Sequence, residues 1–530
     1  MASVALLAFD ACDAGVVRTL AAAGKLPTFR KLFDEWASAK ILNPYGIFVG
    51  AIWPTFFTAL SPERVRFHCW ETISPATYER RLTKASEIVG QPFWRRLGAA
   101  GRRVAIIDVP HIRVKGPVNG LEISEYGCHD RHFGFHASSP QLADEVVDRV
   151  GFHPVLSVDP FAERQFAPDD YLHREARLRT IEEERALLHD MLDGLERKNR
   201  LSQWIFERER WDLFISVFGE SHAIGHQSWH LHDPSHPRYD GAAAKSIGDP
   251  LERVYASLDR ALAEHLSLLG KQGNVLVLLS HGMGPHYDGT QLLEAVLLRI
   301  EALHQSAMGG SPLVRVAKAA WARLPESARM ALSPAAAAML RRRARRNPPA
   351  ISEEVDSGAA NRAARRFFMT PNNSVYGGIR INLAGREPSG RVRPGRDLDA
   401  ACEFIRRELL GLINVDTGEA AVRSVERTEA YYDRAPDDEL PDLFVDWNRN
   451  GPIETVWSPR IGFVHAPYLH WRTGDHRLNG FIFASGPDIR PRTNLGQIAN
   501  GDLGPTICAM LGHRLDGVDG RPVPALLRTR

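Results

Sequence analysis

The sequence is poor in cysteine and lacks any long hydrophobic run. Its five cysteines are scattered through 530 residues and none forms a C-x-x-C pair, which argues against a disulfide framework and favours a reducing compartment. No stretch reaches the roughly 18 apolar residues of a membrane-spanning helix. The first apolar run, from Val4 to Phe9, is too short for a signal peptide and lacks a basic flank. We therefore expect a cytoplasmic protein.

An excess of charge of either sign is also missing. Lys and Arg number 66 against 64 Asp and Glu, so the net charge is +2. This balance gives no electrostatic reason to expect nucleic acid as a specific partner. The composition, 44% hydrophobic and 25% charged, is typical of a soluble globular protein and excludes disordered, collagen-like and coiled-coil classes.

Short apolar runs alternate with long helical patterns, which predicts an α/β fold with a mixed, mainly parallel sheet between helices. The early runs are apolar throughout, as expected for strands covered on both faces. The expected strands are 4–9, 104–108, 213–218, 275–280, 378–382, 443–446 and 481–485. Helices are expected at about 15–35, 180–209, 249–270 and 397–413, and Thr180 with Glu183 predicts a capping box at the start of the second.

One segment, 306–366, breaks this alternation because it is rich in Ala and Arg and carries the basic run Arg341–Arg346. We interpret it as an inserted lid or mobile segment between two parts of one core, 1–305 and 367–530. The basic run suits contact with an anionic surface or a polyanionic substrate, although a solvated insertion is the favoured interpretation.

Polar side chains gather where the expected strands end, the usual place for ligands in open parallel sheets. A carboxylate with several imidazoles at one sheet edge predicts a divalent transition metal, zinc or manganese. Ordinary roles compete for each residue alone, such as a helix N-cap for the aspartate or surface exposure for the helical histidines. The combination over four strand ends carries the argument: Asp10, then Glu220, His222 and His226, then Ser280 and His281, and finally His476 before the last strand.

The order and spacing of several motifs are similar to those of the alkaline-phosphatase superfamily, specifically its type I phosphodiesterase/nucleotide pyrophosphatase branch. The resemblance runs nearly end to end. It rests on Phe9-Asp10, Gly24-Lys25-Leu26-Pro27-Thr28-Phe29, Trp53-Pro54-Thr55-Phe56 to Ser61-Pro62, His222-x-x-x-His226, Ser280-His281-Gly282-Met283-Gly284, Gly385-Arg386-Glu387-Pro388, Arg472-Thr473-Gly474-Asp475-His476 and Asp502-Leu503-Gly504-Pro505-Thr506.

The resemblance implies an alkaline-phosphatase-like core with an inserted lid segment, and one or two divalent ions, zinc first and manganese second. Asp10, His226, His281 and His476 match metal ligands of that family, and His222 stands at a further ligand position. Two such ions would neutralise the oxygens of a phosphoric ester during in-line displacement.

Three positions depart from the family pattern. Ile52 stands where the family has its nucleophilic Thr or Ser, and Ser280 stands where it has an Asp ligand. His222 also replaces an Asp, although imidazole can bind zinc.

Several groups compete to make up for the missing nucleophile. Thr55 lies in the first turn expected after Pro54 and offers a hydroxyl, but it stands about 300° around a helix from Ile52. Water activated by the metal is the slightly favoured alternative, with Glu220 or His286 as general base. His286 with Asp288 is also an alternative replacement for the ligand lost at Ser280. The thiol of Cys12 is less suited, because nothing beside it in sequence lowers its pKa.

We therefore expect a metal-dependent hydrolase of small phosphoric esters, diesters before monoesters. Arg386 and Arg472 are expected to bind phosphate oxygens, with structural ion pairing as the equal alternative. Hydrolysis or transfer of a sulfate or phosphonate ester is the alternative within the superfamily. A non-catalytic descendant that binds such a ligand is the rival class, and Ile52 and Ser280 favour it.

Overall fold

The computed structural model describes residues 4–114, 116–130, 132–157, 178–270, 273–306, 358–372, 375–435, 438–468 and 472–527. The chain forms two compact units. Unit 1 comprises Met1–Phe67, Lys84–Pro285 and His470–Arg530, and unit 2 comprises His68–Thr83 and His286–Leu469. The expected insertion at 306–366, with Arg341–Arg346, lies mostly outside the described residues.

A nine-stranded sheet forms the centre of unit 1, in the order β20-β2-β19-β9-β1-β8-β5-β6-β7. Strands β9, β1, β8, β5 and β6 run parallel, whereas β19 is antiparallel to both β9 and β2. The mixed, mainly parallel α/β sheet is thus confirmed. The strands are β1 (Val4–Phe9), β2 (Ala37–Leu42), β5 (Val104–Ile107), β6 (Gly120–Ser124), β7 (His136–Ala137), β8 (Leu213–Phe218), β9 (Asn274–Leu279), β19 (Gly480–Ser485) and β20 (Asn494–Ala499).

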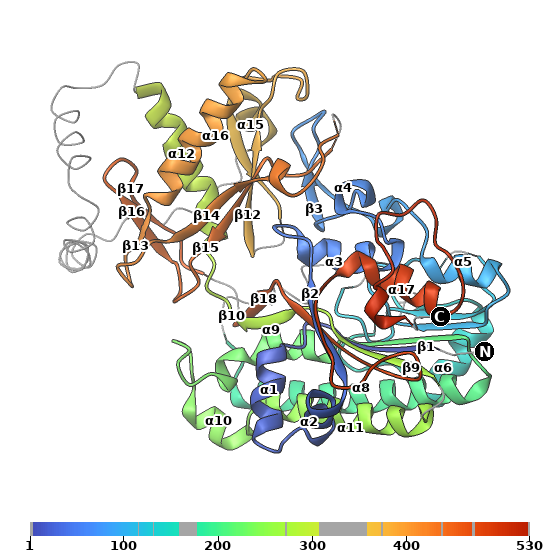
Figure 1. Cartoon of the computed structure of the whole chain (residues 1–530). Helices are drawn as coiled ribbons and strands as arrows, with labels where there is room; N and C mark the ends of the chain where they lie inside the picture. Colours follow the sequence, from blue (N-terminus) through green and yellow to red (C-terminus); the bar gives the residue numbers. More distant parts are fainter. Residues whose placement is uncertain are drawn as a thin grey trace. The chain divides into compact units, whose positions relative to one another are not determined.

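Helices cover both faces of this sheet: α1, α2, α8 and α11 lie on one face, and α3, α5 and α17 on the other (Figure 1). The helices of unit 1 are α1 (Ala14–Ala22), α2 (Pro27–Glu35), α3 (Phe48–Thr58), α4 (Pro62–Val65), α5 (Phe93–Ala99), α6 (Pro140–Val150), α8 (Ile181–Arg208), α9 (Glu220–His232), α10 (Gly241–Ile247), α11 (Pro250–Leu269) and α17 (Leu503–Met510). Among the described residues, no helix is both long and apolar enough to cross a membrane.

The ends of the expected helices show which local signals were decisive. Helix α8 begins after Thr180, and the predicted capping box with Glu183 is present. The single helix expected at 15–35 is wrong, because the structure has two helices there. Gly24 adopts a φ of 76°, which other residues disfavour, and Pro27 then occupies the first turn of α2.

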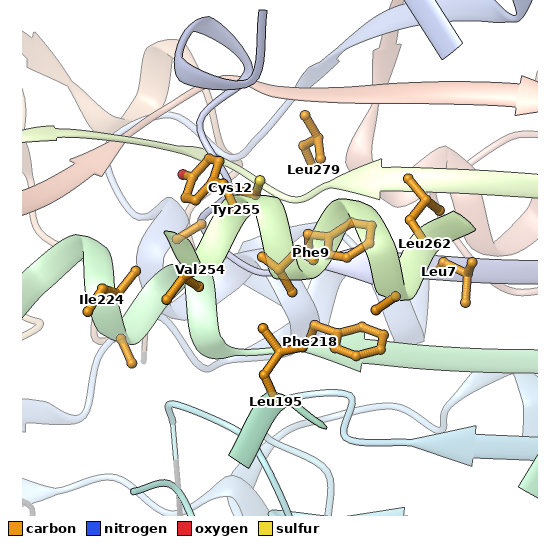
Figure 2. Close-up of a cluster of buried hydrophobic side chains, with 14 of the residues drawn as sticks. Leu7, Phe9, Cys12, Leu195, Phe218, Ile224, Val254, Tyr255, Leu262 and Leu279 are labelled. Atoms are coloured by element: carbon orange, nitrogen blue, oxygen red, sulfur yellow. The ribbon is translucent and has the colours of Figure 1, made fainter. Parts of the chain in front are cut away.

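The main core of unit 1 lies between the sheet and the layer of α8 and α11. Leu7, Phe9, Phe218 and Leu279 from the central strands meet helical side chains such as Leu262 in this layer (Figure 2). The rings of Phe9 and Phe218 stack with centroids 5.5 Å apart. All residues of β1, β8 and β9 are buried, which explains why their sequences are apolar throughout rather than alternating.

Unit 2 contains a four-stranded antiparallel sheet, in the order β11-β12-β15-β14, and two smaller sheets. The strands expected at 378–382 and 443–446 exist, but they belong to this sheet and not to the parallel one. Only residues 371–375 separate β11 from β12, too few for a parallel crossover. The elements are β3 (Glu71–Ile73), β4 (Arg80–Leu82), α12 (Thr290–Ser306), α15 (Ala359–Ala364), β11 (Phe367–Thr370), β12 (Tyr376–Ile381), α16 (Arg396–Leu410), β13 (Ile413–Asn414), β14 (Val422–Arg427), β15 (Leu443–Trp447), β16 (Thr455–Ser458) and β17 (Gly462–His465).

A fully buried ion pair joins α8 to the sheet of unit 1. Asp108, directly after β5, accepts hydrogen bonds from the backbone N–H groups of Tyr126 (2.8 Å) and Gly127 (2.6 Å). Its carboxylate also receives the ammonium of Lys198, and neither side chain of this pair is exposed. The charge of Asp108 is therefore held by donors from two segments.

We predict that Lys198→Met destabilises the protein by about 3–5 kcal/mol, because it leaves the Asp108 charge buried without its cation. Urea denaturation of the variant and the parent measures the difference. The control is Lys31→Met, which removes an exposed pair with Glu35 at 4.0 Å and should change stability by less than about 1 kcal/mol. Equal effects of the two substitutions would contradict the structural role of the buried pair.

Candidate metal centre

The topology of unit 1 brings three chemically active segments to one edge of the sheet. Strand β1 lies between β8 and β9 and runs parallel to both. The residues that follow these strands, Asp10, Glu220 and Ser280, therefore emerge at the same carboxyl edge, where ligands bind in such sheets.

His476 reaches this edge on a separate ribbon. Strand β18 (Gly474–Arg477) pairs antiparallel with β10 (Gly282–Pro285), and Met283 lies opposite His476. The ribbon passes so close to α9 that a Cβ atom on Gly474 would lie 2.1 Å from the carbonyl oxygen of Gly225. Glycine at position 474 therefore allows β18 to approach α9, which carries His222 and His226.

The carboxylate of Asp10 is buried and bonded by three side chains. Its Oδ1 accepts hydrogen bonds from Trp53 Nε1 (2.9 Å) and Ser280 Oγ (2.8 Å), and its Oδ2 lies 2.7 Å from His222 Nδ1. Burial by itself raises the pKa of Asp10, but His222, His281 and the Ser280 hydroxyl outweigh it and hold the pKa below its ordinary range. Asp10 is therefore ionised at neutral pH.

Three imidazole nitrogens converge beside Asp10. The Nε2 atom of His222 lies 3.1 Å from Nε2 of His226 and 2.8 Å from Nε2 of His476. All three rings are buried. Nitrogens that are each bound about 2.0–2.1 Å from one tetrahedral zinc ion lie roughly 3.3 Å apart, close to the separations of His222 Nε2 from the other two nitrogens.

The opposite nitrogen of each of these three rings faces an oxygen acceptor. His222 Nδ1 faces the Asp10 carboxylate, and His226 Nδ1 lies 2.8 Å from the carbonyl oxygen of Gly474. His476 Nδ1 lies 3.3 Å from Oδ1 of Asp475. For His222 and His226, the acceptor at Nδ1 places the proton there and leaves the lone pair on Nε2, as in most histidines that bind metals.

His281 adds a fourth imidazole, oriented by the serine before it. Ser280 Oγ donates to Asp10, accepts from the backbone N–H of Ala11 (3.0 Å), and lies 2.9 Å from His281 Nδ1. His281 must therefore donate from Nδ1, so its buried Nε2 carries a lone pair with no hydrogen-bond partner. His222, His281 and His476 each offer a ligand atom within 4.8 Å of the others.

Burial keeps three histidines of the cluster, His226, His281 and His476, in the neutral form that binds metals. It lowers the pKa of His281 to about 3 and that of His226 and His476 well below 6.5. The positive charge of Arg472 lowers the last two further. The half-buried Arg472 thus acts on the cluster electrostatically, and its buried Nε has no hydrogen-bond partner.

The structure places two further potential ligands beside the cluster that the sequence did not suggest. The ring of His129 stacks on that of His222 with centroids 3.9 Å apart, and His129, His222 and His226 form a group with ligand atoms within 4.8 Å. Asp475 forms a similar group with His226 and His476. His129 lies shortly after strand β6, whose sequence has only two apolar residues, Leu121 and Ile123. This pattern was too weak to predict the strand.

The hydroxyl of Thr55 is not brought to the histidines. Phe48, at the start of α3, packs edge-on against His281 and His476 with centroids 5.9 and 6.4 Å away, and Ile52 follows one turn later. Thr55 lies about 10 Å beyond Phe48 along the helix axis. Its methyl group faces Gly501, and its Oγ1 is buried without a hydrogen-bond partner.

Glu220 also lies away from the cluster. His222 and His226 stand about 200° and 240° around α9 from it, so Glu220 occupies the opposite side of the helix. Its fully buried carboxylate instead has His153 Nε2 at 3.4 Å, and His153 Nδ1 accepts from the backbone N–H groups of Val155 and Leu156.

Two other predicted residues, His286 and Arg386, belong to unit 2. His286 Nε2 lies 2.6 Å from an oxygen of Asp288, and His286 Nδ1 lies 2.8 Å from the hydroxyl of Tyr468. The guanidinium of Arg386 forms ion pairs with Asp442 (2.6 Å) and Glu387 (2.8 Å) and is largely buried. Arg386 therefore has the structural role that was the alternative to phosphate binding.

Comparison with known proteins identifies a family for most of the chain. The family model described as type I phosphodiesterase/nucleotide pyrophosphatase matches residues 4–448. No curated protein sequence matches the chain.

Solved structures of an ectonucleotide pyrophosphatase/phosphodiesterase 5 are similar to it. The murine protein is 12% identical, with coverage of 98% of this chain and 97% of the other and a TM-score of 0.47. The human protein is 12% identical, with 99% and 100% coverage and a TM-score of 0.49. An inactive murine variant in complex with AMP is 13% identical, with 99% and 100% coverage and a TM-score of 0.47.

We predict that the metal-free protein loses stability as the pH falls below about 6.5. His226 and His476 stay neutral when folded but take up protons when unfolded, so the unfolded state gains protons and is favoured. Each such histidine contributes up to about 1.4 kcal/mol per pH unit in this window. Urea denaturation between pH 7.5 and 4.5, with a chelator present, measures the slope.

The unfolding free energy should depend less steeply on pH in His226→Gln, because this variant lacks one of these histidines. His232→Gln is the matched control on the same helix, because Asp249 raises the pKa of His232 above its ordinary value against the effect of burial. Its stabilising contribution is present at low pH and lost as pH rises, so its removal should steepen the slope. The same pH dependence of the unfolding free energy in the parent and in both variants would contradict the prediction.

Proposed function

Because the chain belongs to the type I phosphodiesterase/nucleotide pyrophosphatase family, we propose that the imidazole cluster of unit 1 is its metal centre and that zinc is its metal. Family membership makes the protein a phosphodiesterase-type hydrolase that depends on a divalent metal. Small phosphoric esters fit this family as substrates. A cytoplasmic location is also part of the proposal, supported by five free and buried cysteine thiols.

One observation carries the proposal: Nε2 of His222 lies 3.1 Å from Nε2 of His226 and 2.8 Å from Nε2 of His476. Lone pairs that point at one another repel unless a cation lies between them. Imidazole nitrogen suits zinc better than magnesium, calcium or manganese, which favour oxygen ligands. The ligand group proposed on this basis is Asp10, His222, His226, His281 and His476.

The residues of the chain supply binding and orientation. A bound zinc ion would polarise a phosphoryl oxygen and lower the pKa of water. Arg472 places a second positive charge near the same histidines, and its Nε–H has no hydrogen-bond partner among the described residues. We propose that Arg472 binds a phosphate oxygen through a charge-assisted hydrogen bond.

Water is the proposed nucleophile because neither residue of α3 is suited to attack phosphorus. The side chain of Ile52 has no nucleophilic atom, and that of Thr55 packs against Gly501. Of the two expected general bases, Glu220 faces His153 on the far side of α9 from the histidines, and His286 belongs to unit 2, where its Nε2 is held by Asp288.

The rival proposal is a protein that binds a phosphoric ester without hydrolysing it. Ile52 and Ser280 favour it, because they remove a hydroxyl nucleophile and a carboxylate from the family pattern. Turnover distinguishes the two proposals directly.

We predict that the zinc-loaded protein hydrolyses aryl phosphodiesters faster than aryl phosphomonoesters or aryl sulfates. His476→Ala should abolish turnover and metal binding together, because it removes one of the three converging nitrogens. Thr55→Val retains the volume of the side chain and should change kcat by less than about threefold if water is the nucleophile. A covalent route through Thr55 would instead cost several orders of magnitude.

Metal content by elemental analysis and steady-state rates on the three ester classes are the measurements. A Thr55→Val variant that keeps its metal but is as inactive as His476→Ala would contradict the role of water. A zinc-loaded parent that binds the esters without hydrolysing any of them would support the binding protein instead.

A further inference from the structure

We propose that this centre holds one cation on the Nε2 atoms of His222, His226 and His476, and that Asp10 is a positioning residue for His222 and not a ligand. The inference rests on the proposed function only in requiring that a cation binds the cluster. It departs from the two-ion centre that the family resemblance implies.

The first argument is the direction of the three imidazole rings. Two of the Nδ1 atoms have an oxygen acceptor, the Asp10 carboxylate for His222 and the Gly474 carbonyl for His226, and His476 Nδ1 lies 3.3 Å from an oxygen of Asp475. These oxygens come from two segments, the end of β1 and strand β18, and Nε2 of His222 lies within 3.1 Å of Nε2 of both other rings. A shell of acceptors behind the ligand nitrogens is how proteins fix imidazoles that bind a metal.

The second argument is that the oxygens of Asp10 are already used. Oδ1 accepts from Trp53 and Ser280, and Oδ2 faces the Nδ1 atom of His222. The side chain is 1% exposed, so solvent does not replace a lost donor. A cation on Oδ2 would share that oxygen with the Nδ1–H group of His222 and weaken the bond that orients the ring carrying the central Nε2 atom.

The third argument is that the described donors of unit 1 alone offer no complete second set of ligands. In the described part of unit 1, four groups of three donors are close enough to hold an ion. They are His129–His222–His226, His222–His281–His476, His226–Asp475–His476 and Asp10–Asp130–His222. Every group includes at least one of the three converging histidines, so none remains intact once these bind the first ion.

Ser280 is the residue that prevents a second ion from binding beside Asp10. Its hydroxyl donates to Asp10 and accepts from Ala11 N–H and from His281 Nδ1, which uses its one proton and both lone pairs. Among the described groups bonded to Ser280, His281 is the one with a ring nitrogen, Nε2, that has no hydrogen-bond partner. One donor is too few, since a zinc site needs at least three protein ligands.

The test is the number of zinc ions bound and their affinity, which do not depend on turnover. The metal-free full-length chain is dialysed against buffered zinc, and bound metal is measured by elemental analysis and by competition with a chromophoric chelator. We expect one tightly bound ion per chain. Two ions bound with similar affinity would overturn the proposal.

Variants separate ligands from the positioning residue. His226→Ala should lower zinc affinity by more than about 10³-fold. Asp10→Asn keeps the shape and should leave one ion with an affinity about 10–100-fold lower, the usual effect of losing an acceptor behind a ligating imidazole. His232→Ala, on the same helix but outside the four groups, is the control and should bind like the parent. Loss of zinc from Asp10→Asn as complete as from His226→Ala would overturn the role of Asp10.

A gain of binding provides a test that does not depend on the stability of Asp10→Asn. Ser280→Asp removes the hydroxyl that donates to Asp10 Oδ1 and adds a carboxylate, so the freed Oδ1, the new carboxylate and His281 Nε2 make three donors outside the histidine triplet. We expect this variant to bind a second ion, weaker than the first, and a parent that already binds two would show no such gain. Turnover by a protein with one bound ion supports both proposals. One bound ion without turnover contradicts only the proposed hydrolysis. Turnover by a protein with two bound ions contradicts only the inference of a single ion.

Discussion

The buried carboxylate of Asp10 is the constraint on which the metal edge of unit 1 depends. An ionised group among apolar strands requires donors around it, and they come from Trp53 in α3, Ser280 after β9 and His222 in α9. One charge thus connects three segments that are far apart in sequence. The orientation of the His222 ring follows from it, and so does the meeting of its Nε2 atom with those of the other two histidines.

The replacement of carboxylates by imidazoles changes the electrostatics of such a centre. The imidazole of His222 and a serine hydroxyl at position 280 stand where the family pattern has aspartates, so fewer negative charges offset a bound cation. The cation, with Arg472 nearby, would therefore attract phosphate oxygens more strongly. The serine at position 280 also removes a carboxylate donor, so stronger anion attraction and the proposed single ion share one structural cause.

Much of unit 1 was predictable because local signals and burial agree there. The uniformly apolar runs of β1, β8 and β9 predicted strands covered on both faces, and Thr180 predicted the start of α8. Position after a strand also indicated Asp10 and His281 as site residues. The runs at 378–382 and 443–446 predicted strands equally well, but an apolar run does not reveal which sheet it joins. Pairing depends on chain connections, and the short link between β11 and β12 placed these strands in an antiparallel sheet.

By itself, the sequence determined the α/β class, the family resemblance and the kind of donor atoms at the strand ends. These depend on residue type and spacing, which local patterns express. Only the tertiary structure decided that Trp53 and Ser280 occupy the oxygens of Asp10, that Glu220 faces away from the histidines, and that His129 stacks on His222. Such contacts join residues that are distant in sequence, and the direction of a hydrogen bond depends on the whole fold rather than on any local pattern. Whether a histidine turns its Nε2 or its Nδ1 toward a metal is set by the acceptor behind it.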